Sequence, residues 1–219
     1  MKYFIFSIDD GTIWDKETIT LLNKYGFKAT FNLNSGLQEF VWYLDDLPIE
    51  RLDLYQNKEL YNGHEVASHT LTHPYLDQCG DEDIIREVNE DIFNLENIFN
   101  REIVSFATPF ETCKEREISI IRDHTKVTNI RMSEIDESFT KPIDPYHIKV
   151  TALDIYRAHE LINGFINNPD AEVFVYAGHS YDFYVGKSFD KLEELLQILD
   201  KNRDHIRVVT MQEMVNKLF

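Results

Sequence analysis

The stretch Tyr3-Phe4-Ile5-Phe6-Ser7-Ile8, followed at once by Asp9-Asp10-Gly11, indicates how the fold begins. Its apolar run predicts a buried strand, and Asp10-Gly11 is typical of the turn that ends one. In α/β folds, active sites form where buried strands end. Asp9 and Asp10 are therefore candidate functional residues, and if the chain is still extended there, their side chains point to opposite faces.

Strands and helices alternate along the chain beyond this point. Asp15 can cap a helix that runs to Tyr25, and Gly26 offers a left-handed stop before a second strand over residues 27–33. A helix is expected over residues 49–61, with a stop at Gly63. Further strands are expected over 65–68, 103–107, 127–130, 147–151, 173–177 and 206–209, and further helices over 83–99, 116–123, 156–166, 192–199 and from the capping box Thr210-Met211-Gln212-Glu213.

This alternation, without a break in composition, argues for one α/β domain over residues 1–219, with a parallel sheet of seven or eight strands closed into a barrel. The alternative is an open doubly wound sheet, but the Gly-rich phosphate loop that such folds often carry is missing. The predicted strand ends place Asp9-Asp10, His69, residues 107–110 and His179 on the same rim of the barrel. This convergence predicts an active site there.

The charge of the chain excludes some classes of partner. Its 219 residues include 39 acidic and 22 basic ones, which gives a formal net charge of −17. A nucleic-acid backbone or an anionic membrane surface would be repelled at long range, so we expect neither as a partner. The same charge mildly favours a neutral or cationic substrate and attracts metal cations, although an acidic surface also serves solubility alone.

The cysteine content and the hydropathy pattern bear on the compartment. Cys79 and Cys113 are too few for a disulfide framework, and no apolar segment approaches the roughly 20 residues of a membrane span. The apolar opening Met1–Ile8 is far shorter than a secretion signal with its cleavage site, and Asp9-Asp10 interrupts it. A cytoplasmic location is the expectation. The sequence leaves the oligomeric state open.

The segment His69-Thr70-Leu71-Thr72-His73 is a candidate metal site. On a helix, two His four residues apart lie on the same face and can bind one cation, although this spacing more often belongs to surface or core histidines. Pro74 favours a short turn over a long helix here. His64 lies five residues from His69 and, on a helix, about 140° around from it, so its expected role is packing.

Longer stretches of the chain carry a family resemblance. Phe6-Ser7-Ile8-Asp9-Asp10-Gly11 and Gly63-His64-Glu65-Val66-Ala67-Ser68-His69-Thr70-Leu71-Thr72-His73-Pro74 resemble the first two motifs of the polysaccharide deacetylases, the NodB-homology carbohydrate esterases. Residues 27–32 resemble the family's second strand, so the likeness is strong over the first 76 residues and continues more weakly, in order, to His179. The resemblance implies a distorted (β/α) barrel of about seven strands.

The resemblance also implies roles for individual residues. Three residues would bind a divalent metal ion, first of all zinc, with cobalt, nickel and iron as alternatives: Asp10, His69 and His73. Asp9 would be the general base, His179 the general acid, and the backbone N–H of Phe110 would stabilise the oxyanion. The implied activity is a metal-dependent deacetylation, through an activated water, of an N-acetylated or, as second choice, an O-acetylated carbohydrate.

Two of the family's motifs are altered in this chain. Where the third motif has an Arg that orients the base and then, after Pro, an aromatic residue and Gly, this chain has Ala107-Thr108-Pro109-Phe110-Glu111. Without the guanidinium of that Arg, the base loses a charge-assisted hydrogen bond, unless Arg86 or Arg131 supplies a guanidinium instead. The fourth motif has no clear counterpart, and Asp154 is a positional candidate for supporting His179.

Two alternative functions stay open. Ala107 and Glu111 also suit a noncatalytic, carbohydrate-binding relative, and the absence of a visible leader suits a cytoplasmic amidase that cleaves a small nonsugar amide. Several aromatic residues in predicted loops could stack on sugar rings or simply pack, namely Trp42, Tyr43, Tyr181, Phe183 and Tyr184. The sequence names neither the exact substrate nor the metal.

Overall fold

The main sheet of the protein is parallel and has eight strands. The computed structural model describes all 219 residues. Its strand order is β10 (Ile206–Val208), β1 (Lys2–Asp9), β2 (Thr30–Leu33), β5 (Glu65–Ser68), β6 (Ser105–Ala107), β7 (Asn129–Ile135) and β8 (Ile148–Val150), and β9 (Val173–His179) pairs with β1. All of these pairings are parallel, as the alternation of strands and helices predicts.

The sheet closes into a barrel between β8 and β9. Just beyond β8, Ala152 forms a parallel bridge with Tyr176, and the N–H of Thr151 donates to the carbonyl of Val175 at 2.7 Å. β10 lies outside the ring, beside the first residues of β1. The remaining seven strands form the closed ring, so the prediction of a distorted (β/α) barrel with about seven strands is confirmed.

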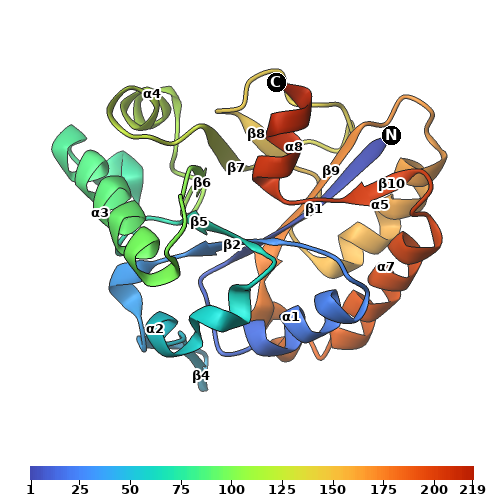
Figure 1. Cartoon of the computed structure of the whole chain (residues 1–219), viewed down its shortest axis with the longest axis horizontal. Coiled ribbons are helices and arrows are strands. Elements are labelled where there is room, and N and C mark those ends of the chain that lie inside the picture. Colours follow the sequence, from blue (N-terminus) through green and yellow to red (C-terminus); the bar gives the residue numbers. More distant parts are fainter.

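Helices follow most of the strands and cover the outside of the barrel (Figure 1). One side carries α1 (Asp15–Lys24), α5 (Ile155–Asn167), α6 (Ser180–Val185) and α7 (Phe189–Lys201). The other side carries α3 (Asp81–Phe99) and α4 (Glu115–His124), while α8 (Met211–Leu218) packs against β1. The short helices are α2 (Leu54–Asn57), η1 (Ser35–Leu37), η2 (Lys58–Tyr61) and η3 (Leu76–Gln78).

The side chains of β1 alternate between two cores, which explains its nearly continuous apolar sequence. Three of them belong to a cluster of 42 buried residues that includes the inner faces of the helices, namely Phe4, Phe6 and Ile8. Ile5 belongs to a second cluster of 10 buried residues, together with Val175 and Met214 of α8. Ser7 and Asp9 continue this second, inward-facing row, so the alternation brings Asp9 to the mouth of the barrel.

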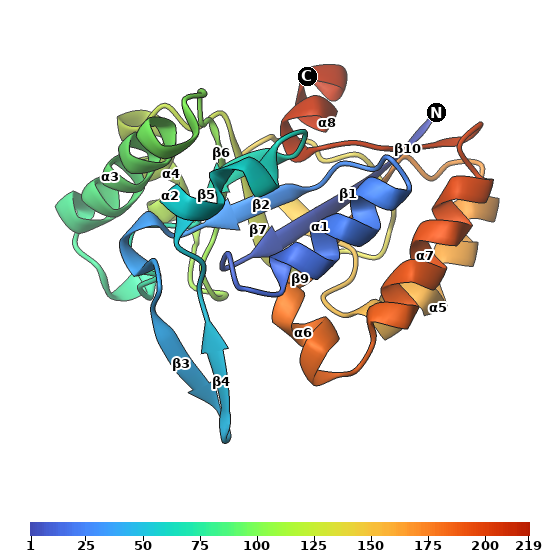
Figure 2. The ribbon, with the colours of Figure 1, turned by 60° about the horizontal axis from the view of Figure 1, so that its bottom comes forward.

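The expected helix over residues 49–61 is wrong in its first part. Strands β3 (Val41–Leu44) and β4 (Leu47–Glu50) form an antiparallel hairpin that projects from the barrel (Figure 2), and only α2 and η2 follow as short helical turns. The turn Asp45-Asp46 contains no Gly, so the usual hairpin signal is absent. Asp45 adopts the left-handed φ of 52° itself.

Several local signals in the sequence have the predicted effect, and one does not. Gly26 and Gly63 have φ of 63° and 87°, as expected for residues that end helical turns. The capping box of α8 is formed, because Glu213 N–H donates to Thr210 Oγ1 at 3.2 Å and Thr210 N–H donates to Glu213 Oε2 at 3.1 Å. Asp15, however, lies inside α1 and is fully buried rather than capping the helix, whose N-cap is Trp14.

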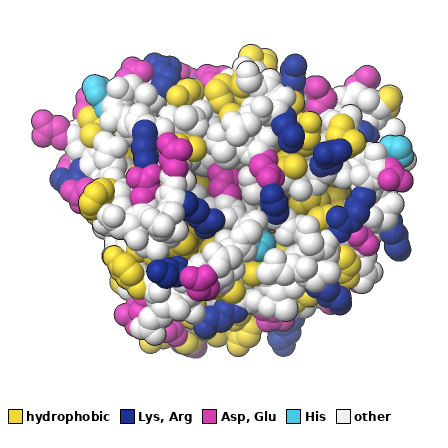
Figure 3. Space-filling model, viewed as in Figure 1, with side chains coloured by type: hydrophobic (Ala, Val, Ile, Leu, Met, Phe, Trp, Pro, Cys, Tyr) yellow, Lys and Arg dark blue, Asp and Glu magenta, His cyan; other side chains and the backbone are white.

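Charged side chains are distributed over the surface rather than gathered. Figure 3 shows acidic side chains interspersed with basic ones across the face seen in Figure 1, despite the net charge of −17. Among the helices, none combines the length and apolar character needed to cross a bilayer.

Candidate active site at the mouth of the barrel

A cavity of about 650 Å³ opens at the C-terminal ends of the barrel strands. The residues that the sequence singles out for catalysis and metal binding all line it: Asp9, Asp10, His69, His73, Phe110 and His179. They lie at the ends of four different strands or just after them, β1, β5, β6 and β9, which only the closed barrel brings together. The structure therefore assembles the predicted set, and the individual roles stay predictions.

Asp9 ends β1 with its carboxylate held from two sides. Nη2 of Arg131 lies 2.5 and 2.6 Å from its two oxygens, and Asn32 Nδ2 donates to Oδ1 at 2.6 Å. Arg131 comes from β7 and is 2% exposed, so its charge is little screened by water. Arg86, the other candidate for replacing the third-motif Arg, lies on the surface of α3 and pairs with Asp83 instead.

Asp10 follows β1 in a different backbone conformation. Its φ is 81°, a left-handed value that is uncommon for a residue other than Gly. The chain is therefore no longer extended at Asp10, and the condition under which the two Asp side chains would point to opposite faces is not met. Arg51 donates from Nε to the Asp10 backbone carbonyl at 3.0 Å and from Nη2 to Oδ1 at 2.5 Å. Burial alone would raise the pKa of the Asp10 carboxyl, but His179, Arg51 and the two neighbouring imidazoles together lower it.

His69 and His73 lie on an irregular loop after β5, not on a helix. Thr70 and His73 adopt left-handed φ values of 69° and 56°, which fold the loop back so that the two Nε2 atoms lie 3.2 Å apart. His69 Nδ1 lies 2.9 Å from the carbonyl of Ala107, which can only accept, so Nδ1 carries the proton and Nε2 keeps its lone pair. Burial lowers the pKa of both imidazoles, which keeps them neutral near pH 7.

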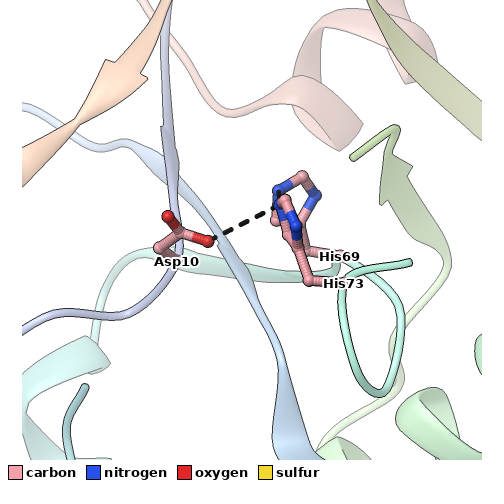
Figure 4. Close-up of side chains that lie close together, drawn as sticks. All are labelled: Asp10, His69 and His73. Carbon is pink, nitrogen blue, oxygen red and sulfur yellow. Dashed lines mark hydrogen bonds and ion pairs between the residues drawn. The ribbon is translucent and has the colours of Figure 1, made fainter. Parts of the chain in front are cut away.

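The side chains of Asp10, His69 and His73 form a donor set that suits a divalent cation. The donor atoms of Asp10, His69 and His73 all lie within 4.8 Å of one another, and Figure 4 shows the carboxylate facing the paired imidazoles. Asp10 Oδ1 lies 3.8 Å from His73 Nε2. In a tetrahedral zinc site with bonds of about 2.1 Å, neighbouring donors lie about 3.4 Å apart. The 3.2 Å between the two Nε2 atoms and the 3.8 Å between Asp10 Oδ1 and His73 Nε2 are close to that spacing.

A second layer of side chains holds the metal-binding loop. Asp91 of α3 is fully buried and accepts from Ser68 Oγ at 2.6 Å and from the N–H of Ser35 at 2.7 Å, while the N–H of His69 lies 3.3 Å from the same carboxylate. Burial raises the pKa of Asp91 to about 7. His64, for which the sequence predicts a packing role, is buried against Phe31 and does not line the cavity.

His179 ends β9 on the opposite side of Asp10. Its Nε2 lies 3.8 Å from Asp10 Oδ2, and its Nδ1 lies 2.9 Å from Asp182 Oδ2. Burial lowers the pKa of His179, but Asp182 and the carboxylates of Asp10 and Asp9 outweigh burial and raise it to about 9. The suggestion that Asp154 supports His179 is wrong, because Asp154 caps α5 by accepting from the N–H of Arg157 at 2.8 Å.

The backbone N–H of Phe110, the predicted oxyanion donor, has no partner within the protein. The φ of Phe110 is 54°, and its carbonyl accepts from Ser133 Oγ at 2.6 Å. The ring of Phe110 stacks on Tyr75 with 4.0 Å between centroids and packs against His73. The loop is thereby fixed with one N–H free to bind a ligand atom.

The aromatic residues singled out for sugar stacking separate into two groups. Trp42 and Tyr181 line the cavity and contact each other edge to face. Phe183 is fully buried in the core, Tyr184 packs on Trp14, and Tyr43 is exposed on the hairpin away from the cavity lining. Packing is therefore the observed role of Phe183, while Trp42 and Tyr181 are the aromatic residues of this group that line the cavity.

Sequence reasoning missed three residues that contact the site. Asn32 is the register partner of Asp9, and it became visible only once β1 and β2 were paired. Asp182 lies three residues after His179 at the start of α6, a capping-box spacing that could have indicated it. Arg51 had no signal at all, because it fell within the helix expected over residues 49–61, whereas in the structure it directly follows the β3–β4 hairpin.

Known proteins resemble this chain in sequence. A family model described as polysaccharide deacetylase matches residues 1–128. The curated chitooligosaccharide deacetylase of Sinorhizobium fredii (strain NBRC 101917 / NGR234) is 32% identical over 90 residues. That match covers 40% of this chain and 36% of the relative's length, so it spans little more than a third of the relative.

Solved structures resemble the whole barrel. The Xyl-CE4 domain of a multidomain xylanase from the hindgut metagenome of Trinervitermes trinervoides has a TM-score of 0.67 at 15% identity, covering 99% of this chain and 90% of that one. A mutant of BA3943 from Bacillus anthracis, a CE4 family pseudoenzyme with restored enzymatic activity, has a TM-score of 0.64 at 17% identity, covering 97% and 67%. At these identities the likeness shows the shared fold.

Proposed function

Because the chain belongs to the polysaccharide deacetylase family, we propose that it is a metal-dependent hydrolase that removes acetyl groups from an N-acetylated carbohydrate, or as second choice from an O-acetylated one. One observation carries this proposal: five residues with compatible chemistry meet in one cavity, namely Asp9, Asp10, His69, His73 and His179. The deacetylase activity named for the Sinorhizobium relative supports the choice of an N-acetylated sugar.

The donor set at the cavity floor would hold the cation. Asp10 supplies an anionic oxygen, and His69 and His73 supply neutral Nε2 atoms, which is a usual ligand set for catalytic zinc. When bound, such a cation polarises the acetyl carbonyl and lowers the pKa of a water molecule into the neutral range. Cobalt, nickel and iron remain alternatives to zinc.

Asp9 would accept the proton of the attacking water. Its Oδ2 lies 3.9 Å from His69 Nε2, beside the proposed cation but bonded to other partners. Arg131 and Asn32 fix the carboxylate, so the base does not have to reorganise during the reaction. The guanidinium that Ala107 cannot provide is therefore supplied by β7.

Two further groups complete the reaction. The N–H of Phe110 is free to donate to the oxygen on which negative charge develops, an interaction that typically contributes about 3 kcal/mol. His179 carries a proton at neutral pH and its Nε2 faces the cavity, so it can protonate the leaving nitrogen as the C–N bond breaks. The products are acetate and a free amine.

The direct test is an assay of acetate release. Purified protein, loaded with zinc or cobalt, is incubated with N-acetylglucosamine oligomers, acetylated xylan and a small nonsugar acetamide. We expect release from the sugar oligomers, loss of activity after chelation, and recovery on adding back the cation. Silence on every acylated substrate would refute the proposal, and release from the nonsugar acetamide alone would favour the amidase alternative.

The noncatalytic alternative is less well supported by the site. This alternative was suggested by Ala107 and Glu111 in the third motif, where Ala107 cannot orient the base. Arg131 contacts the Asp9 carboxylate instead, so the absence of an Arg at position 107 no longer argues against catalysis. A pseudoenzyme among the structural neighbours keeps this alternative relevant. Sugar binding without turnover in the same assay would favour it.

A further inference from the structure

The base of the β3–β4 hairpin is joined to the turn that carries Asp10. Thr12 and Arg51 form an antiparallel bridge, the N–H of Ile13 donates to the carbonyl of Glu50 at 3.0 Å, and the N–H of Leu52 donates to the carbonyl of Gly11 at 2.9 Å. The hairpin therefore does more than project from the barrel. Its last residues form a short strand pairing with the segment directly after Asp10.

This pairing directs the Arg51 guanidinium onto Asp10. The side chains of Arg51 and Asp10 are each 7% exposed, and Arg51 donates both to the backbone carbonyl and to Oδ1 of Asp10. The guanidinium also lies over the ring of Trp42, with its Cζ 4.9 Å from the ring centroid. Arg51 is thus confined between the hairpin and the proposed metal ligand.

Asp10 requires such a partner because its backbone is strained. A φ of 81° costs a residue other than Gly free energy, and such conformations persist only where surrounding contacts enforce them. Arg51 contacts the backbone and the carboxylate of the same residue, so it fixes the direction of the side chain relative to the turn. The oxygen it contacts, Oδ1, is the one that lies 3.8 Å from His73 Nε2.

We propose that Arg51 is a positioning residue that holds the Asp10 carboxylate in place for the cation. This inference rests on the proposed function of the site. A carboxylate oxygen can accept from Arg51 and still offer a lone pair to a metal ion, and the negative charge then lies between two positive ones. Partners that hydrogen-bond to metal ligands typically change metal affinity by about 10- to 100-fold when removed.

The experiment measures metal affinity rather than turnover. Metal-stripped wild-type protein, Arg51→Met and Arg51→Lys are titrated with Co²⁺, and binding is followed by the visible absorption of the bound ion. We expect the Kd of Arg51→Met to rise about 10- to 100-fold. The Kd of Arg51→Lys should rise less, because lysine keeps the positive charge but lacks the planar guanidinium that donates two hydrogen bonds to Asp10. An unchanged Kd in Arg51→Met would overturn the proposal. A lower Kd would also overturn it, since Arg51 would then act only as a charge that opposes the cation.

A matched control separates positioning from general stability. Arg101 also stacks on an aromatic ring, that of Phe99, and donates to a backbone carbonyl, that of His64 at 2.7 Å, but it lies outside the cavity. Arg101→Met should keep the wild-type Kd even if its melting temperature falls. If Arg51→Met does not fold, Arg51→Lys decides, and a wild-type Kd in that variant overturns the proposal.

The same titration distinguishes this inference from the proposed function. If wild-type protein binds Co²⁺ and releases acetate while the Arg51 variants bind equally well, only the positioning role fails. If wild-type protein binds no Co²⁺, the metal-dependent function itself fails.

Discussion

Ala107 and Arg131 are register partners on the neighbouring parallel strands β6 and β7. Paired residues of parallel strands present their side chains on the same face of the sheet, so a guanidinium placed at either position is directed to the same part of the barrel mouth. In this chain Arg131 occupies that place and binds Asp9. The family's third motif would supply a guanidinium from β6, whereas in this chain β7 supplies it.

Removing this guanidinium should disable the base. Arg131→Met leaves Asp9 buried with Asn32 as its remaining partner, so kcat/KM for acetate release should fall about 100-fold. The double variant Ala107→Arg, Arg131→Met returns the charge from β6 and should recover part of the loss. Circular dichroism melting checks that both variants fold. A wild-type kcat/KM in Arg131→Met would show that Asp9 needs no orienting cation.

Asp9 and Asp10 should respond differently to the loss of charge. Asp9→Asn should lower kcat by about 100- to 10,000-fold, the contribution of a general base, while Co²⁺ affinity stays close to that of the wild type. Asp10→Asn should instead weaken Co²⁺ binding, because a neutral amide is a poorer ligand. Parallel titrations and rate measurements check this division. Equal loss of metal affinity in both variants would mean that both carboxylates bind the ion.

The protonation of His179 should set the alkaline limit of activity. Its pKa is raised to about 9 against the effect of burial, chiefly by Asp182, so the proton is available below that pH and is lost as the pH rises through it. Asp182→Asn removes this stabilisation and should move the alkaline limb of the kcat/KM profile to lower pH. Asp190→Asn, an exposed carboxylate on α7, serves as the control. Identical limbs in wild type and Asp182→Asn would exclude His179 as the acid.

Asp15 should make the protein less stable as the pH rises. Burial raises the pKa of Asp15 from its ordinary 3.8 to about 7 in the folded chain, where it accepts from the hydroxyl of Tyr61 at 2.8 Å. Between these values the unfolded chain has lost a proton that the folded chain retains, so the free energy of unfolding falls by about 1 kcal/mol per pH unit. Urea unfolding of metal-stripped wild type and Asp15→Asn should therefore diverge between pH 4 and 7. A constant difference between the two would contradict this expectation.

Strong local signals in the sequence predict several elements of the fold. The apolar run of β1 becomes a buried strand because both of its faces are covered, and the capping box of α8 forms because its two residues satisfy each other's backbone. The segments that precede Asp10, His69 and His179 also lie on predicted strands. Since parallel strands end at one edge of a barrel, the set of candidate residues followed from order along the chain.

The contacts between side chains within that set depend on how the strands and loops pack in the folded chain. The sequence could not choose between Arg86 and Arg131, because the choice depends on which strand lies beside β6. It missed Arg51 entirely, because a hairpin turn without Gly gives no local signal and the contact with Asp10 joins residues 41 positions apart. Local patterns fix backbone conformation over a few residues, whereas the partners of a buried charge are set by long-range packing.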